Sequence, residues 1–268
     1  MRPTRLILTI AVLLGMLPLP AIAQMREQFD LQSVTPERSA SAAEPNIAQA
    51  EQAIVDRTNQ FRQQHGLPAV TNNAELVATA QYFADYMART GDYGHEADGQ
   101  RPSERARKHG YNFCIITENI AKQFNTAGFT TEQLASGFIT GWIESPEHRA
   151  NLLDGDVMHI GVAIAEGRKN YFYAVQMFGR PASARLVFQI SNQSDANISY
   201  TLTGQGDEEQ FELPPRYTRT HQRCRPSQIR FSWNQQTQLT PTSGSRYVVQ
   251  GSAAQGLEVT EGDASSQP

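Results

Sequence analysis

Two histidines and two glutamates carry the chemistry that this sequence offers most clearly. His95 lies in the glycine-rich segment "YGHEADG", Glu118 interrupts the apolar run "CIITENIA", and Glu144 and His148 lie in "GWIESPEHRANLL". Charged side chains are seldom buried unless they are paired or bound to a ligand, so Glu118 in its apolar run requires a partner.

Each of these residues also has an interpretation without chemistry. His95 could be an exposed loop histidine, since single histidines are common and ligands are rare. Glu118 could cap a neighbouring helix or pair with an arginine. Ser145 and Pro146 favour the start of a short helix, and His148 would then be an ordinary residue of that helix. Taken singly, these simpler interpretations are favoured.

Familiar catalytic motifs do not occur. The pair His95-Glu96 lacks the second histidine of H-E-x-x-H, and His148 is followed by Arg149. The chain has no G-x-S-x-G elbow, and neither of its two cysteines lies in a nucleophile signature. If the chain is an enzyme, Glu118 is the candidate general base of a metal-dependent hydrolase.

The amino terminus is typical of an exported protein. Arg2 and Arg5 precede an apolar stretch from residue 6 to residue 17, and Ala21-Ile22-Ala23 forms a small-residue cleavage site. This pattern predicts a signal peptide over residues 1–23 and a periplasmic or extracellular location. The stretch is too short to span a membrane, and no later segment is long enough, so we expect no transmembrane segment.

The net charge excludes one class of partner, and the two cysteines allow one cross-link within the chain. The formal net charge is −4 and no basic stripe is visible, so nucleic acid is not an expected partner. Cys114 and Cys224 could form a disulfide in an oxidising compartment or remain separate buried thiols, and the sequence leaves this open. It also leaves the oligomeric state open.

Helical periodicity dominates the middle of the chain. Apolar residues recur at helical spacing over residues 47–61 and 76–87, and Gly66 and Gly91 end these two helices. A short helix is expected over residues 103–109. Thr130 and Gln133 form a capping box for a further helix, and "IGVAIAEGRKNYFYAVQMFG" predicts two strands around a turn.

We therefore expect an α+β protein with several segments. Polar composition predicts a disordered lead-in over residues 24–45, followed by an α-β layered domain over residues 46–181. Short β-type runs separated by turns predict a small all-β domain over residues 185–262, and residues 263–268 are a tail.

The motifs in this order resemble the CAP superfamily of cysteine-rich secretory proteins, venom antigens and plant pathogenesis-related proteins, in its bacterial SCP-like extracellular branch. The resemblance covers about residues 48–179 and rests on "GHEADGQRPSERARKHGY", "ENIA", "GWIESPEHRANLLDGDVMHIGVAI" and "YFYAVQMFG". It implies a three-layer α-β-α sandwich with an open cleft lined by two histidines and acidic residues.

Matched position by position, the resemblance implies that His95 and His148 are the cleft histidines and that Glu118 is the first cleft glutamate. The two imidazoles and one carboxylate implied in this way, from His95, His148 and Glu118, are a plausible ligand set for a borderline cation, with Zn²⁺ the first candidate. The second glutamate of the family falls at Ser145 here, and Glu144 lies one residue earlier. A residue before a proline is disfavoured in helical conformation, so the backbone is expected to turn at this point. Glu144 is therefore the least secure member of the set.

Three functions follow as hypotheses. The resemblance favours a binding module for a small apolar, lipid-like or cell-envelope ligand, with a metal assisting. The first alternative is a metal-dependent, peptidase-like hydrolase that uses His95, His148 and Glu118. The second is a purely structural polar network that stabilises the sandwich.

Overall fold

The structure, a computed structural model, describes residues 44–204 and 207–262. The expected signal peptide, the lead-in up to residue 43 and the tail lie outside the described residues. The described residues all belong to one compact unit, Ala40–Pro268. Within them, no helix is long and apolar enough to cross a membrane.

A four-stranded sheet forms the centre of the α-β part, and its order is β1-β3-β4-β2. The strands are β1 (Thr71–Asn72), β2 (Phe113–Phe124), β3 (His159–Glu166) and β4 (Tyr171–Pro181). Strands β3 and β4 form the expected hairpin, joined by the short 3-10 helix Arg168–Asn170. Strand β2 was not predicted, although it pairs with β4 along almost its whole length.

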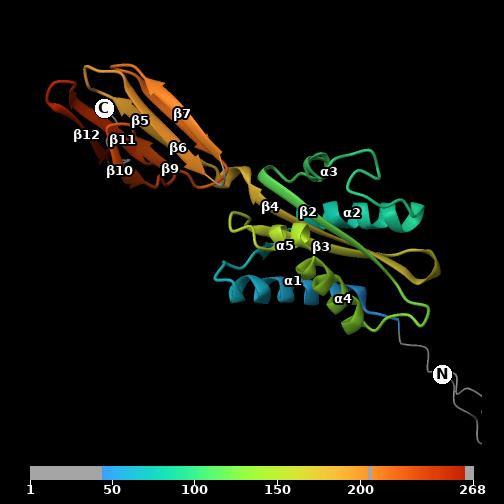
Figure 1. Cartoon of the computed structure of the whole chain (residues 1–268). Helices are drawn as coiled ribbons and strands as arrows, with labels where there is room; N and C mark the ends of the chain where they lie inside the picture. Colours follow the sequence, from blue (N-terminus) through green and yellow to red (C-terminus); the bar gives the residue numbers. More distant parts are fainter. Residues whose placement is uncertain (1–43, 205–206, 263–268) are drawn as a thin grey trace, which may run out of the picture. The chain divides into compact units, whose positions relative to one another are not determined.

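One face of this sheet is covered by α1 (Ile47–Gln64), α4 (Thr131–Glu144) and α5 (Pro146–Leu152) (Figure 1). The predicted capping box of α4 is present, because Thr130 and Gln133 each accept a hydrogen bond from the other's backbone amide. The apolar face of α4 places Phe138 and Trp142 in the core with Ile54 of α1. Burial of large apolar side chains is the main force that holds this layer to the sheet.

The opposite face is covered by α2 (Ala74–Thr90) and α3 (Pro102–Lys108), so the α-β part has three layers, α-β-α (Figure 1). The side chain of Asn73 caps the start of α2, and Gly91 ends the helix in a left-handed conformation. The buried stripe of α2, with Phe83 and Met87, packs on apolar residues of β3 and β4. The expected fold class is therefore confirmed.

Residues 185–262, here called the β-region, have strands as their regular elements wherever the structure describes them, and these strands form two four-stranded sheets. Its strands are β5 (Leu186–Asn192), β6 (Ile198–Gly204), β7 (Asp207–Leu213), β8 (Thr218–Arg223), β9 (Gln228–Phe231), β10 (Asn234–Leu239), β11 (Arg246–Ser252) and β12 (Gly256–Gly262). The sheets have the orders β10-β9-β6-β7 and β12-β11-β5-β8. Residues of both sheets, including Phe188 and Tyr200, share one apolar core, so the β-region is a sandwich.

Gly161 shows how closely α2 approaches the sheet. A Cβ atom at Gly161 of β3 would overlap the backbone of Leu76 and Val77 in α2, whereas one at Gly141 on α4 would meet no atom within 4 Å. Gly161→Ala is therefore expected to destabilise the protein by about 1–3 kcal/mol or more. Gly141→Ala, at an exposed helical position, should stabilise it by about 0.5–1 kcal/mol. Urea unfolding of both variants checks this, and equal midpoints would refute the close approach.

Candidate functional site

The buried side chain of Arg105 donates four hydrogen bonds close to the predicted site residues. It lies on α3 with no exposed side-chain surface. Its Nη1 donates to Asp98 Oδ1 at 2.8 Å and to the carbonyl of Gln100 at 2.7 Å. Its Nη2 donates to the carbonyl of His95 at 2.9 Å and to Glu118 Oε2 at 2.7 Å. Arg105 thus holds the glycine-rich loop and strand β2 together.

The carboxylate of Glu118 is buried and doubly engaged. Its side chain is 1% exposed on β2. One oxygen accepts from Arg105, and the other lies 2.8 Å from Nδ1 of His95. The structure therefore supplies the arginine partner that a glutamate in an apolar run required, and it leaves neither oxygen of Glu118 without a protein contact.

His95 is held from two sides but still reaches solvent. Its carbonyl is bound by Arg105, its Nδ1 by Glu118, and its side chain remains 49% exposed. The hydrogen bond with Glu118 raises the pKa of His95 above its ordinary value, although burial and the charge of Arg105 act against this rise. Because Nδ1 is engaged, Nε2 is the ring nitrogen that remains available to a ligand.

Helix α5 presents His148 above a buried polar network. Ser145 is its N-cap and Pro146 its first residue, as predicted, although the Ser145 side chain makes no capping hydrogen bond. Asn119 of β2 donates to the carbonyl of His148 at 3.2 Å, and Asn151 donates to the carbonyl of Glu118 at the same distance. These two bonds join α5 to strand β2.

The network continues through the side-chain amides of strands β2 and β4. Asn119 also donates to Gln176 at 3.0 Å and accepts from Asn151 at 2.8 Å. Gln176 in turn donates to Thr58 of α1 at 2.9 Å. Asn119, Gln176 and Thr58 are completely buried, so these bonds satisfy groups that would be costly to leave unpaired.

The imidazole of His148 has no hydrogen-bond partner within the described part of the chain. The ring is partly buried, and its pKa is lowered by burial and by the charge of nearby His95. Strand β2 holds the two histidines through neighbouring residues, since Glu118 binds the ring of His95 and Asn119 binds the carbonyl of His148. His148 therefore presents a neutral ring at neutral pH, with a nitrogen lone pair free to bind.

Glu147, rather than Glu144, is a further carboxylate whose charge acts on both histidines. At His95 it adds to the larger rise in pKa caused by Glu118, and at His148 it acts against the lowering of the pKa by burial. Glu144 is exposed at the last position of α4, and no contact within the described residues joins it to either histidine. Membership of Glu144 in the site stays a prediction, and Glu147 was missed by the sequence analysis.

No three histidine, cysteine, aspartate or glutamate side chains are already gathered for a metal ion within residues 44–204 and 207–262. Of the predicted set, Glu118 is committed to Arg105 and His95, and it therefore orients His95 instead of offering a free oxygen. A carboxylate that binds Nδ1 of a histidine fixes the ring and makes its other nitrogen a better ligand. His95 and His148 are the donors that remain.

Removal of Arg105 should be far more damaging than removal of a surface arginine. Arg105→Gln removes the guanidinium that pairs with two buried carboxylates, Asp98 and Glu118, and leaves Glu118 with His95 as its partner. We therefore expect a loss of about 3–5 kcal/mol in the free energy of unfolding. Arg57 pairs with Glu132 at the surface, with side chains 30% and 72% exposed. Arg57→Gln is the matched control and should cost at most about 1 kcal/mol. Comparable losses in urea unfolding would show that the buried pair has no special role.

The pKa values of the two histidines should lie on opposite sides of the ordinary histidine value of about 6.5. NMR titration of the imidazole Cε1–H signals should place His95 above and His148 below this value. His95 then contributes stability at acid pH that is lost as pH rises through its raised pKa. His148 contributes stability above pH ~6.5 that is lost as pH falls through its lowered pKa. A reversed order of the two pKa values would contradict the geometry described above.

Comparisons with known proteins agree on the α-β part of the chain. Residues 55–178 match the family model described as the cysteine-rich secretory protein family, CAP. A curated relative, the uncharacterized protein YkwD of Bacillus subtilis, is 26% identical over 127 residues, which are 47% of this chain and 46% of YkwD. The matched part thus spans about half the length of that relative.

Solved structures with similarity to this chain include two bacterial proteins. An outer surface protein from Borrelia burgdorferi is 19% identical with a TM-score of 0.43, and the match covers 49% of this chain and 92% of that protein. An extracellular protein containing an SCP domain from Bacillus anthracis is 25% identical with a TM-score of 0.41, covering 50% and 41% of the two chains. The family-model match and the sequence motifs agree that residues 55–178 are similar to the CAP family, and the curated relative is a bacterial protein.

Proposed function

We propose that this protein is an exported binding module that holds its ligand at the histidine pair His95 and His148. The observation that carries the proposal is that some site residues already have protein partners for their polar atoms and others do not. Glu118 is buried and bound on both oxygens, whereas His148 has an unpartnered ring and His95 a free Nε2. The groups left available for an external molecule are therefore two imidazole nitrogens.

A divalent cation, with Zn²⁺ first, fits these donors. Imidazole nitrogen is a preferred ligand of Zn²⁺, and Glu118 already orients His95 as a metal ligand requires. Glu147 is exposed and close enough to influence both rings, so it could add a carboxylate oxygen. When bound, the cation would supply a positive centre with open positions for oxygen atoms of a ligand.

The lipid-like or cell-envelope ligand expected from the resemblance is retained in this proposal. An anionic head group, such as a phosphate or carboxylate, is the part of such a molecule that a cation between two imidazoles would hold. The export signal expected over residues 1–23 supports a role after export, where envelope molecules of this kind are within reach.

Hydrolysis through Glu118 is a weaker alternative on physical grounds. A general base must be free to reach the proton that it removes. Glu118 is 1% exposed, and its two oxygens are occupied by Arg105 and His95, so neither is free to reach a substrate or water. The alternative of a purely structural polar network explains the contact between Glu118 and Arg105 well. It gives no role to the ring of His148, which is partly exposed and has no hydrogen-bond partner among the described residues.

Zinc titration of metal-free protein by calorimetry tests the proposal. Wild type should bind one Zn²⁺, and His95→Ala or His148→Ala should weaken binding at least about tenfold. Binding should also weaken as pH falls, because a protonated imidazole cannot bind a metal. Glu147→Gln should have a smaller effect, and Glu144→Gln is the matched control that should bind like wild type.

Thermal unfolding separates this function from a structural role. His148→Ala removes a ring without hydrogen-bond partners, so its melting temperature without metal should remain close to that of wild type. A large loss of stability together with unchanged zinc affinity would instead support the structural network. Absence of zinc binding by wild type would refute the metal-assisted proposal.

A further inference from the structure

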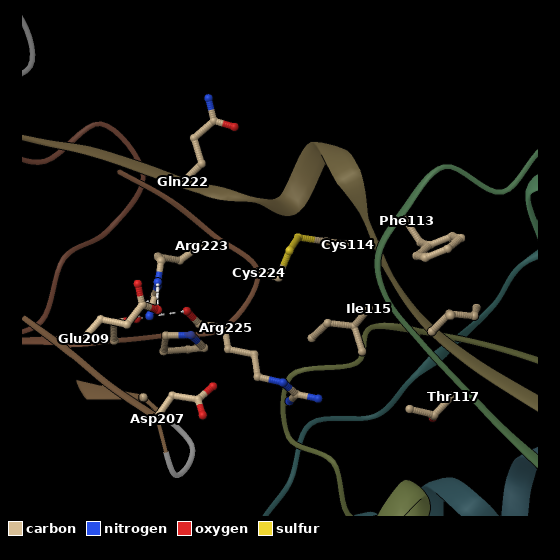
Figure 2. Close-up of a pocket in the computed structure, with 14 residues that line it drawn as sticks. Phe113, Cys114, Ile115, Thr117, Asp207, Glu209, Gln222, Arg223, Cys224 and Arg225 are labelled. Atoms are coloured by element: carbon tan, nitrogen blue, oxygen red, sulfur yellow. Dashed lines mark hydrogen bonds and ion pairs between the residues drawn. A yellow bond between two sulfur atoms is a disulfide. The ribbon is translucent and has the colours of Figure 1, made fainter. Parts of the chain in front are cut away.

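Two adjacent residues of the β-region contact two different segments of the α-β part. They are Cys224 and Arg225, which directly follow β8. Cys224 forms a disulfide with Cys114 at the start of β2 (Figure 2). Arg225 pairs with Asp154 and Asp156, in the loop between α5 and β3.

The ion pairs of Arg225 are well formed. Its guanidinium binds both oxygens of Asp154, at 2.9 and 2.7 Å, and one oxygen of Asp156 at 2.8 Å. Burial acts to raise the pKa of Asp154, but hydrogen bonds from Arg225 and from the Asp156 amide bring it below its ordinary value. Charge-assisted bidentate contacts of this kind fix orientation as well as distance.

Both contacted segments carry residues of the proposed binding site. Cys114 and Glu118 lie on the same strand, β2, four residues apart. Asp154 follows His148 by six residues, and helix α5 connects them. Within the α-β part, these segments are joined by the Asn119–His148 and Asn151–Glu118 hydrogen bonds, each 3.2 Å long.

The loop after α5 is also held from inside the α-β part. Arg62 donates to the carbonyls of Leu152 and Asp154, both at 2.8 Å. Arg62 thus fixes the backbone, whereas Arg225 binds the carboxylates. Without Arg225, two part-buried carboxylates would lose this cation and repel one another, so the loop would shift to separate or hydrate them.

We propose that the Cys224–Arg225 corner braces strand β2 against the α5–β3 loop and thereby positions His148 relative to His95. Arg225 is a positioning residue, since it acts on the histidines through Asp154, Asp156 and helix α5. This inference rests on the proposed binding function and gives the β-region, which lies outside the family match, a part in it.

Three variants of the full-length oxidised protein test the brace. Arg225→Gln removes the charge, and Arg225→Lys keeps it but cannot reproduce the bidentate contact. Arg223→Gln is the matched control, because the neighbouring Arg223 pairs with Glu209 inside the β-region. Thermal unfolding first establishes that all three variants fold.

NMR of metal-free protein gives a readout that is independent of metal binding. The His148 Cε1–H signal and its titration midpoint should change in Arg225→Gln, change less in Arg225→Lys, and stay as in wild type in Arg223→Gln. A His148 signal that is unchanged in folded Arg225→Gln would overturn the brace, whatever the metal affinity.

Zinc affinity provides the second readout. Arg225→Gln should weaken zinc binding about three- to tenfold, less than the roughly 10- to 100-fold typical of residues that contact a metal-binding side chain directly. Equal affinities of Arg225→Gln and Arg223→Gln would exclude positioning by Arg225. If wild type binds no zinc, the proposed metal-assisted function fails, while the NMR comparison still decides whether Arg225 positions His148.

Discussion

The buried contact between Arg105 and Glu118 is the interaction on which the candidate site depends. It joins helix α3 to strand β2 at 2.7 Å, and the same guanidinium also binds the loop that carries His95. Buried ion pairs are often no more stable than apolar contacts of similar size, but they tolerate few alternative arrangements. The contact therefore matters less as a source of stability than as a constraint. It fixes Glu118, Glu118 fixes the His95 ring, and the ring then presents only one nitrogen to solvent.

The two histidines differ because their surroundings differ. His95 has a carboxylate partner that favours its charged form, while His148 is partly buried beside another imidazole and favours its neutral form. One ring is thus oriented by the protein, and the other is left unpartnered above a polar network that holds its backbone. This asymmetry suits a site that holds an external cation or ligand, since one donor is fixed and the other can adjust.

Some features were predictable because their causes are local. Asn73 and Thr130 cap helices through neighbours three residues away, and the apolar stripes of these helices follow from their periodicity. Strand β2 was missed because a glutamate and an asparagine interrupt its apolar pattern, and both are buried only through partners distant in the sequence. Arg105 was missed for the same reason: nothing in "SERARKHG" distinguishes an arginine that becomes buried from one that stays exposed.

The sequence alone determined the resemblance to the CAP family, the α+β class, the helix starts, and the identity of His95, Glu118 and His148 as candidate site residues. These conclusions rest on residue types and spacings that act over a few positions, or on motifs in a fixed order. Only the tertiary structure decided that Arg105 pairs with Glu118, that the charge of Glu147 acts on the pKa of His95, and that Cys114 and Cys224 form a disulfide. Each of these is an interaction between segments far apart along the chain. Such contacts depend on how layers and loops pack, which local pattern does not encode.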